Sequence, residues 1–236
     1  MNMSMNLSNL VRKTAMAAAL ALAAASFSVA ESRSDWKAHW ITHPWVQSTT
    51  NTWISYRKEV NVTKRPDKLV AKIAVDSKYW MWINGELVVF EGGLKRGPFP
   101  NGTYYDKVDI APFLKEGNNT VAILLWHFGK QGFSHNSSGQ AALIFEAISP
   151  ELKILSDNSW LCVPNPAYGS TDAPHPNYRL SESNIRFEAR KDLRGWNMPG
   201  FDVRRKMHRA ANVDEVAWPA MGELVERPIP MWKDYG

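Results

Sequence analysis

The sequence predicts an all-β fold, a β-sandwich in which helices are confined to single turns within loops. Three observations lead to this prediction. Apolar runs rich in β-branched and aromatic residues recur between turn residues from residue 53 to residue 148. The dipeptide Asn84-Gly85 separates two of these runs. After residue 30, no stretch keeps a 3.6-residue apolar period over more than a few turns.

The strongest local signal is a β-hairpin. Its two arms are residues 79–83, with the sequence YWMWI, and residues 87–90, with the sequence LVVF. Both central residues of a type I′ turn need positive φ, which Asn and Gly tolerate best. Asn84-Gly85 between these arms therefore predicts a two-residue turn. In the first arm, Trp80 and Trp82 would share one face of the strand.

The other elements follow from shorter patterns. Asp109 to Lys115 has the composition of one helical turn, which Gly117 would end. Residues 53–60 alternate imperfectly, which is typical of an outer strand. The best candidate for a short helix is at residues 202–210. Further strands are predicted at 69–75, 103–110, 120–126, 141–148, 152–155 and 184–190.

Composition limits the functional classes. The chain has 236 residues, 44% of them hydrophobic and 22% charged, which suits one or at most two globular domains. Its net charge is +5, but the basic residues are scattered, and this favours a solvated surface over a nucleic-acid partner. Cys162 is the only cysteine, so an intrachain disulfide and a thiolate metal cluster are both excluded.

Residues 1–30 have the three parts of a signal peptide. Arg12 and Lys13 form a positive start, residues 14–25 form an alanine- and leucine-rich segment, and Ser28-Val29-Ala30 fits the small-x-small cleavage rule. The apolar segment is too short to span a bilayer. We expect cleavage after Ala30 and an exported protein, periplasmic or secreted.

Motifs for intrinsic catalysis are weak. No Gly-x-Ser-x-Gly elbow, P-loop or dinucleotide glycine pattern is present. A glycosidase needs two carboxylates across a sugar ring, and single carboxylates on strands and turns, of which Asp106 is one, are usually surface residues. His39 and His43 are four apart, but Pro44 breaks any helix that would aim both at zinc.

Aromatic residues and polar loops favour a binding role. A sugar site needs a flat aromatic platform and a few fixed polar groups. Eleven tryptophans are present, and Trp40, Trp80 or Trp82, Trp126 and Trp160 are predicted to pack internally. The aromatic residues expected to be exposed, in or beside loops 91–101 and 127–140, are Phe99, Tyr104, Tyr105 and Phe133.

Several segments together resemble one family. They are Trp40-Ile41, residues 75–88 (VDSKYWMWINGELV), 103–125, 128–146 and 184–202, which ends in GWNMPGFD. In these segments the chain resembles the N-terminal, non-catalytic β-sandwich region of bacterial α-L-rhamnosidases. The resemblance implies a jelly-roll sandwich, galactose-binding-domain-like, over residues 31–227. A sub-boundary near residue 150 stays open, and residues 228–236 would begin a linker to a missing domain.

The resemblance also implies a site. Some modules associated with this family bind rhamnose through calcium, with an Asp-Asn pair before the aromatic strand. Asp76 fits the first position as a metal ligand, whereas Ser77 departs from the second and weakens a calcium site. The turn role of Asp76, capping a tight bend, is the alternative. The predicted sugar-binding residues are Asp76, Phe99, Asn101, Tyr104, Phe133, His135 and Asn136.

The family's catalytic carboxylates lie in an (α/α)-barrel and have no counterpart here. We therefore expect a carbohydrate-binding accessory domain for rhamnose-containing carbohydrate, without catalysis of its own. Two alternatives stay open. The chain could be a purely structural domain that packs against the barrel, or the front of an α-L-rhamnosidase that hydrolyses terminal rhamnosides.

Overall fold

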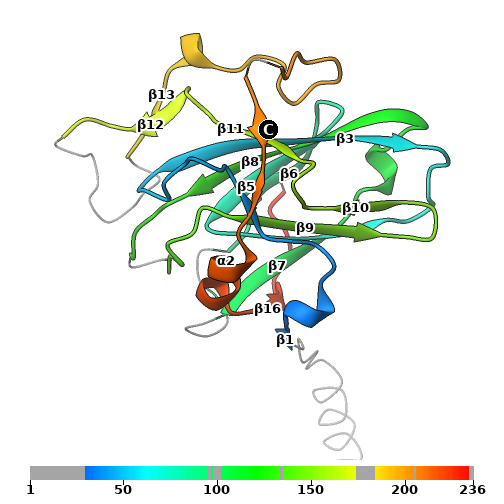
Figure 1. Ribbon diagram of the computed structural model, residues 1–236, viewed down its shortest axis with the longest axis horizontal. Coiled ribbons are helices and arrows are strands. Elements are labelled where there is room, and N and C mark those ends of the chain that lie inside the picture. Colours follow the sequence, from blue (N-terminus) through cyan, green and yellow to red (C-terminus); the bar gives the residue numbers. More distant parts are fainter. Residues whose placement is uncertain are drawn as a thin grey trace, which may run out of the picture.

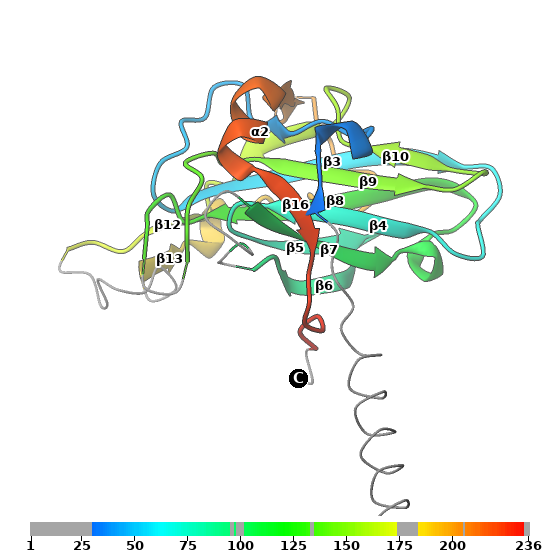
Figure 2. The ribbon, with the colours of Figure 1, turned by 90° about the horizontal axis from the view of Figure 1, so that it is seen from below.

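Two large β-sheets stacked face to face form the body of the molecule, and a two-stranded sheet lies outside them (Figures 1 and 2). The computed structural model describes residues 30–94, 97, 102–132, 135–173, 184–204 and 206–233. This arrangement confirms the predicted all-β sandwich. The predicted signal peptide lies outside the described residues up to residue 29. Within the described ranges, no helix is long and apolar enough to cross a membrane.

The larger sheet contains eight strands of the described chain. Its order is β1 (Ala30–Glu31), β16 (Glu223–Glu226), β7 (Gly102–Asp109), β4 (Val70–Val75), β9 (Leu143–Ile148), β2 (Ile41–Thr42) and β15 (Ala211–Asn212), with β10 (Lys153–Leu155) beside β9. β16 runs parallel to β7, and the other pairs in this sheet are antiparallel.

The second sheet contains six strands in the described ranges, all paired antiparallel. Its order is β14 (His208–Arg209), β11 (Leu161–Pro164), β3 (Thr52–Val62), β8 (Gly117–His127), β5 (Lys78–Ile83) and β6 (Glu86–Gly92). Residues after 150 add β10 to one sheet and β11 to the other. The two halves of the chain therefore build one sandwich.

The predicted hairpin joins β5 and β6. Asn84 and Gly85 form its turn with φ of 54° and 87°, as a type I′ turn requires. The Asn84 side chain also accepts a hydrogen bond from Thr120 N (2.9 Å) and donates to Asn119 Oδ1 (2.9 Å). It thereby ties the turn to β8, which follows the single helical turn η2 (Ala111–Phe113) predicted at this place.

Tryptophans fill both the interior and an outer face of the sandwich. Trp40 and Trp160 have no exposed surface and Trp126 is 2% exposed, which confirms their predicted packing roles. Trp160 lies between the sheets, whereas Trp126 lies on the outer face of the six-stranded sheet. Trp80 and Trp82 are partly buried against the same outer cluster.

This outer face holds a stack of aromatic rings. The Trp53 ring stacks on Trp126 and on Tyr168, with centroids 4.6 and 4.2 Å apart. Tyr168 belongs to β12 (Tyr168–Ser170), which pairs with β13 (Ile185–Phe187) above the sheet. β3, which carries Trp53, lies between β11 and β8 and is buried on both faces along its first half. The prediction of an outer strand was wrong, because β3 pairs with a strand on each side and because β12, β13 and the 193–201 segment cover its outer face.

The outer face of the eight-stranded sheet is covered by α2 (Asp214–Met221) and by the segment around η1 (Arg33–Asp35). The short helix predicted at 202–210 was therefore misplaced. Asp214 and Glu215 in the first turn of α2 complement its dipole. Asp214 also accepts hydrogen bonds from Trp40 N (2.8 Å) and His39 Nδ1 (2.6 Å), which fix the helix on the sheet.

Tyr105 was expected to be exposed and is buried, with 2% of its surface accessible. It lies on the covered face of the eight-stranded sheet, where its ring meets Trp36 edge-on at 5.4 Å. Its hydroxyl donates to Glu31 Oε1 (2.8 Å). The exposure of this residue is decided by the covering segments and not by its own strand.

A buried ion pair joins the two sheets to the segment after β16. Asp106 Oδ1 lies 2.8 Å from Arg227 Nε, and both side chains are less than 5% exposed. Asp106 Oδ2 accepts from the Tyr79 hydroxyl (2.9 Å) and from Gly93 N (2.8 Å). Arg227 Nη2 donates to Gly93 O (3.0 Å). Burial raises the pKa of Asp106, although Arg227 and these donors lower it in part.

We expect Arg227→Met to lower the free energy of unfolding by about 3–5 kcal/mol, because it leaves the Asp106 carboxylate buried without a cation. Tyr79→Phe removes only one hydrogen bond and should cost about 1 kcal/mol. Urea denaturation at neutral pH measures both. A smaller loss for Arg227→Met than for Tyr79→Phe would contradict the structural role of the ion pair.

Candidate functional site

One end of the sandwich carries the residues that the sequence predicted for sugar binding. Asp76 and Ser77 follow β4 at this end. Ser77 N donates to Trp126 O (3.0 Å), and Ser77 Oγ accepts from Phe128 N (3.1 Å). The bend after β4 is thereby fixed to the end of β8, from which the loop 128–140 departs.

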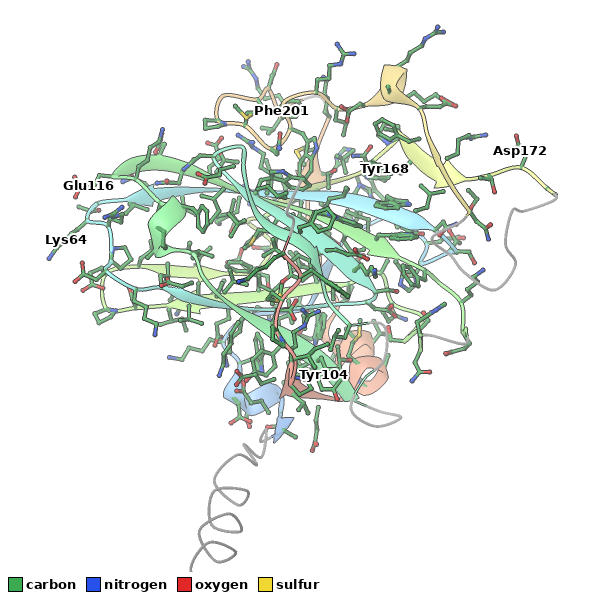
Figure 3. All side chains as sticks on the ribbon, turned by 180° about the vertical axis from the view of Figure 1, so that it is seen from behind. Lys64, Tyr104, Glu116, Tyr168, Asp172 and Phe201 are labelled. Carbon is green, nitrogen blue, oxygen red and sulfur yellow. The ribbon has the colours of Figure 1, made fainter. Side chains whose placement is uncertain are left out.

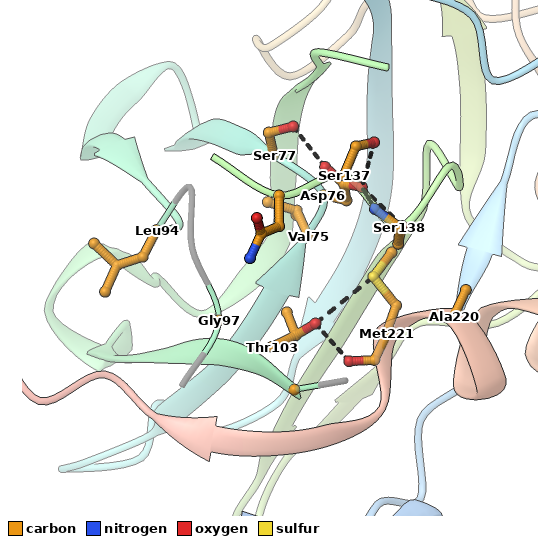
Figure 4. A pocket seen from close by; sticks show the side chains of 12 residues that line it. Val75, Asp76, Ser77, Leu94, Gly97, Thr103, Ser137, Ser138, Ala220 and Met221 are labelled. Atoms are coloured by element: carbon orange, nitrogen blue, oxygen red, sulfur yellow. Dashed lines mark hydrogen bonds between the residues drawn. The ribbon is translucent and has the colours of Figure 1, made fainter. Parts of the chain in front are cut away.

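The Asp76 carboxylate holds that loop. Its Oδ2 accepts hydrogen bonds from Ser138 N (2.6 Å), Ser138 Oγ (2.7 Å) and Ser137 Oγ (3.2 Å), as Figure 4 shows. Its Oδ1 accepts from Ser77 Oγ (2.5 Å) and lies 3.5 Å from His127 Nδ1. Both carboxylate oxygens therefore already have partners within the chain.

These contacts set the charge state of Asp76. Burial by itself would raise the pKa of the carboxyl group. His127 and the hydroxyls of Ser77 and Ser138 favour the charged form more strongly, and the net pKa lies below the ordinary value of 3.8. Asp76 is consequently ionised at neutral pH and acts as an anionic acceptor for the loop.

A small pocket opens beside Asp76. It is lined by residues 75–77, 94, 97, 102–103, 136–138 and 220–221 (Figure 4). Two loops meet here, the one after β6 and the one after β8. The enclosed volume of ≈ 50 Å³ accommodates a few water molecules or one edge of a sugar ring, and it is well below the usual size of a ligand cavity.

The predicted site residues have different positions. Asp76 and Asn136 both line the pocket, and Asn136 is exposed. Tyr104 follows Thr103 in β7, so its side chain points to the opposite face of the strand from the pocket-lining Thr103. Phe99, Asn101 and Phe133 lie outside the described residues.

His135 is enclosed by its own loop. It has no exposed surface, its ring contacts Phe128 edge-on at 4.7 Å, and its Nε2 donates to Lys130 O (2.6 Å). These are the contacts of a histidine that orders a loop. A sugar would have to open the loop to reach this ring, so the predicted contact between His135 and a sugar hydroxyl stays a prediction.

A metal ion at Asp76 would have to displace internal hydrogen bonds. Calcium takes six to eight oxygen ligands, whereas Asp76 Oδ2 is occupied by Ser137 and Ser138. In the described ranges, no group of three or more His, Cys, Asp or Glu side chains could hold a metal ion. As folded, these residues do not fit a calcium ion, and the predicted calcium remains untested.

A second and larger hollow lies on the outer face of the six-stranded sheet. Its volume is ≈ 630 Å³, and residues 57–59, 159, 161 and 200–204 line it. We call it the outer-face groove. Figure 3 labels Phe201 and Tyr168 on this side of the molecule, with Tyr104 on the far side. The groove lies where the 193–204 segment crosses β3 and β11.

Arg57 is one of the residues that line the outer-face groove. Its side chain has no exposed surface. Its Nη1 donates to Trp196 O (2.8 Å) and Met198 O (2.7 Å), and its Nη2 donates to Glu59 Oε1 (2.7 Å). Among the described residues, the buried Nε has no hydrogen-bond partner. Arg57 therefore holds the covering segment on the sheet.

The sequence reasoning did not identify the outer-face groove. Its residues come from three segments that are far apart in the chain. One signal was present in the sequence, because Arg57 and Glu59 share a strand face with Trp53.

Comparisons with known proteins fit this architecture. No protein-family model and no curated protein matches the sequence. Among solved structures, the GH78 rhamnosidase of Bacillus sp. GL1 matches 83% of this chain with 25% identity and a TM-score of 0.70. The α-L-rhamnosidase from Dictyoglumus thermophilum matches 84% with 21% identity and a TM-score of 0.63. That from Aspergillus terreus matches 78% with 19% identity and a TM-score of 0.58.

The fold is thus that of a rhamnosidase-related β-sandwich domain, and the resemblance predicted from the sequence is confirmed. The chain covers 20% of the Bacillus enzyme, 23% of the Dictyoglumus enzyme and 22% of the Aspergillus enzyme. It therefore corresponds to about a fifth of the length of the rhamnosidases that it matches.

We expect Asp76→Asn to lower the free energy of unfolding by about 2–3 kcal/mol at pH 7, because it replaces a charged acceptor by an amide donor facing Ser138 N. The native pKa of Asp76 is depressed, so the stability it contributes is present above pH 3.8 and is lost as the pH falls through the native pKa. Urea denaturation from pH 7 to pH 3 should show the difference from wild type shrinking below about pH 4. A difference that does not depend on pH would contradict this assignment.

Proposed function

We propose that this chain is a non-catalytic carbohydrate-binding domain of an exported α-L-rhamnosidase-like protein, with rhamnose-containing carbohydrate as its ligand. The observation that carries the proposal is the meeting of two loops at the end of the sandwich. The sequence predicts binding residues in both loops, and both contribute residues to one pocket, including Leu94 and Asn136.

The polar groups of this pocket support a sugar ligand. Asn136 is exposed and carries both a donor and an acceptor, as a pair of ring hydroxyls requires. Ser137 and Ser138 are held in place by Asp76, so their positions are fixed before a ligand arrives. Preorganised polar groups reduce the entropy cost of binding.

The remainder of such a protein would supply catalysis. In the family that the sequence resembles, an (α/α)-barrel carries the catalytic carboxylates, and we propose such a barrel as the partner of this domain. The resemblances in structure cover only about a fifth of each enzyme, which fits a domain that works within a longer protein.

Titration calorimetry with L-rhamnose tests the proposal. We expect saturable heat with a dissociation constant of about 1 mM, which corresponds to about −4 kcal/mol. Asn136→Ala should weaken binding by about tenfold, because it removes hydrogen bonds at the pocket rim. Repeating the titration with calcium and then with a chelator tests whether Asp76 contributes to an ion site.

The matched control is Asn118→Ala. Asn118 is also exposed, but it lies at the opposite end of β8, about 30 Å from the pocket at 3.3 Å per residue. It should leave the affinity unchanged. Absence of heat from folded protein with any rhamnoside, or equal effects of the two variants, would contradict sugar binding at this end.

A structural role is the second candidate. It is favoured by the internal hydrogen bonds of Asp76, which leave neither carboxylate oxygen free of a partner. In that case, the domain would stabilise a catalytic barrel without binding sugar. The same titration distinguishes the two candidates, since a structural domain would give no heat with rhamnose.

A further inference from the structure

The outer-face groove has the size of a ligand site and lies away from the sandwich-end pocket. Its volume of ≈ 630 Å³ falls within the range of 300–1,000 Å³ that small-molecule sites usually have. Its lining comes from β3, from the start of β11 and from residues 200–204. None of these residues lines the sandwich-end pocket, so a ligand here would be independent of that site.

A row of residues across three strands forms one side of the groove. Leu161 in β11 lies opposite Arg57 in β3 and opposite Arg209 in β14. Directly opposed residues in antiparallel strands project to the same face. Arg209 therefore stands on the same outer face as Arg57, beside the lining residue Leu161, and it is exposed.

Basic side chains dominate the surroundings of the groove. Arg57, Lys58 and Arg204 line it, and Arg209 stands beside it. Lys206 Nζ lies 5.2 Å from the centre of the Phe201 ring, which also lines the groove.

The two acidic lining residues are both engaged by arginines. Glu59 Oε1 accepts from Arg57 Nη2 (2.7 Å), and Asp202 Oδ1 accepts from Arg204 Nε (3.2 Å). Their charges are thereby offset, and Lys206 also lies close enough to Asp202 to lower the pKa of its carboxyl group. Among the contacts of the described residues, neither Lys58 nor Arg209 forms an ion pair with a carboxylate. The groove is therefore positively charged overall and suits an anionic ligand.

The burial of Arg57 strengthens the positive potential of the groove. Its guanidinium has no exposed surface, and its Nε has no hydrogen-bond partner within the described chain. A charge surrounded by protein is screened less by salt than a charge in water. Its partner Glu59 is 58% exposed, so the charge of Glu59 is screened by water and offsets the positive charge of Arg57 incompletely. Positive potential therefore reaches the groove.

The chemistry of the groove points to a sugar acid. Phe201 and Ser159 both line the groove, and an aromatic ring is the kind of group that packs against the CH groups of a pyranose. A carboxylate is the anion that arginine side chains bind with paired hydrogen bonds. We infer that the outer-face groove binds a carboxylate-bearing pyranose, a uronic acid unit of a polysaccharide, as a second site on this domain.

This inference rests on the proposed carbohydrate-binding function for its ligand class, but it concerns a separate site. Amide chemical shifts of the purified protein distinguish the two sites. The probes are D-glucuronate and D-glucose, which differ only in the carboxylate at C6. We expect glucuronate to shift the amide signals of Leu161 and Phe201 saturably, and glucose to leave them in place.

Single substitutions test which arginine side chains bind the carboxylate of glucuronate. Arg209→Gln should weaken the affinity for glucuronate by about fivefold, and Arg204→Gln by at least as much, because it also frees the Asp202 carboxylate. Arg65→Gln is the matched control, since it removes the same charge from an exposed turn beyond the end of β3. It should leave the affinity within about twofold, because a distant exposed charge is screened.

The possible outcomes separate this site from the sandwich-end pocket. The inference is supported if glucuronate shifts the amide signals at the outer-face groove and if these shifts weaken in Arg209→Gln. This holds even where rhamnose fails to shift Asn136, a result that would contradict sugar binding at the sandwich-end pocket. Three outcomes would each overturn the inference. Glucose and glucuronate could shift the same signals equally, Arg65→Gln and Arg209→Gln could lose the same affinity, or glucuronate could shift only the signals of residues 136–138.

Discussion

The central part of the six-stranded sheet is apolar on both faces, and this constraint shapes the rest of the molecule. Its inner face packs on the eight-stranded sheet, while its outer face carries the Trp53 and Trp126 stack. Exposed aromatic area of this size is costly in water. The chain after β11 therefore returns over the outer face, where β12, β13 and the 193–201 segment bury the rings. The other sheet is covered in the same way by α2 and the segment around η1.

Buried polar groups decide where these covering segments lie. Arg57 donates to the carbonyls of Trp196 and Met198, Asp214 accepts from the Trp40 amide, and Asp76 accepts from Ser138. Arg57 and Asp76 lie beneath a covering segment and bond to its backbone, whereas Asp214 belongs to the covering helix α2 and bonds to the backbone beneath it. Apolar contacts alone would leave such segments free to slide, because the hydrophobic effect has no direction. Charge-assisted hydrogen bonds have a defined geometry and hold them in one place.

The local features of the fold could be predicted from the sequence, and the covered surfaces could not. The Asn84-Gly85 turn depends on two adjacent residues, so its pattern is visible in the chain. The position of Tyr105 beside the loop 91–101 predicts exposure, but Trp36 and Glu31 cover it. The outer-face groove depends on segments around residues 57, 161 and 201 that meet only after folding. At the sandwich end, Asp76 and Asn136 line one pocket, whereas the interior position of His135 follows from a bond to its own loop.

The edge of the eight-stranded sheet has a consequence for solubility. β7 is eight residues long, and a free edge of that length offers backbone donors and acceptors to a strand from another copy. Here, β16 pairs in parallel with the first half of β7. The two-residue strand β1 then pairs with the other edge of β16. Within the described residues, the strands at this edge therefore shorten from eight residues in β7 to four in β16 and two in β1. A tapered edge presents few ladder positions, and Glu223 and Glu226 add charges to it, so both features protect the domain against edge-to-edge aggregation.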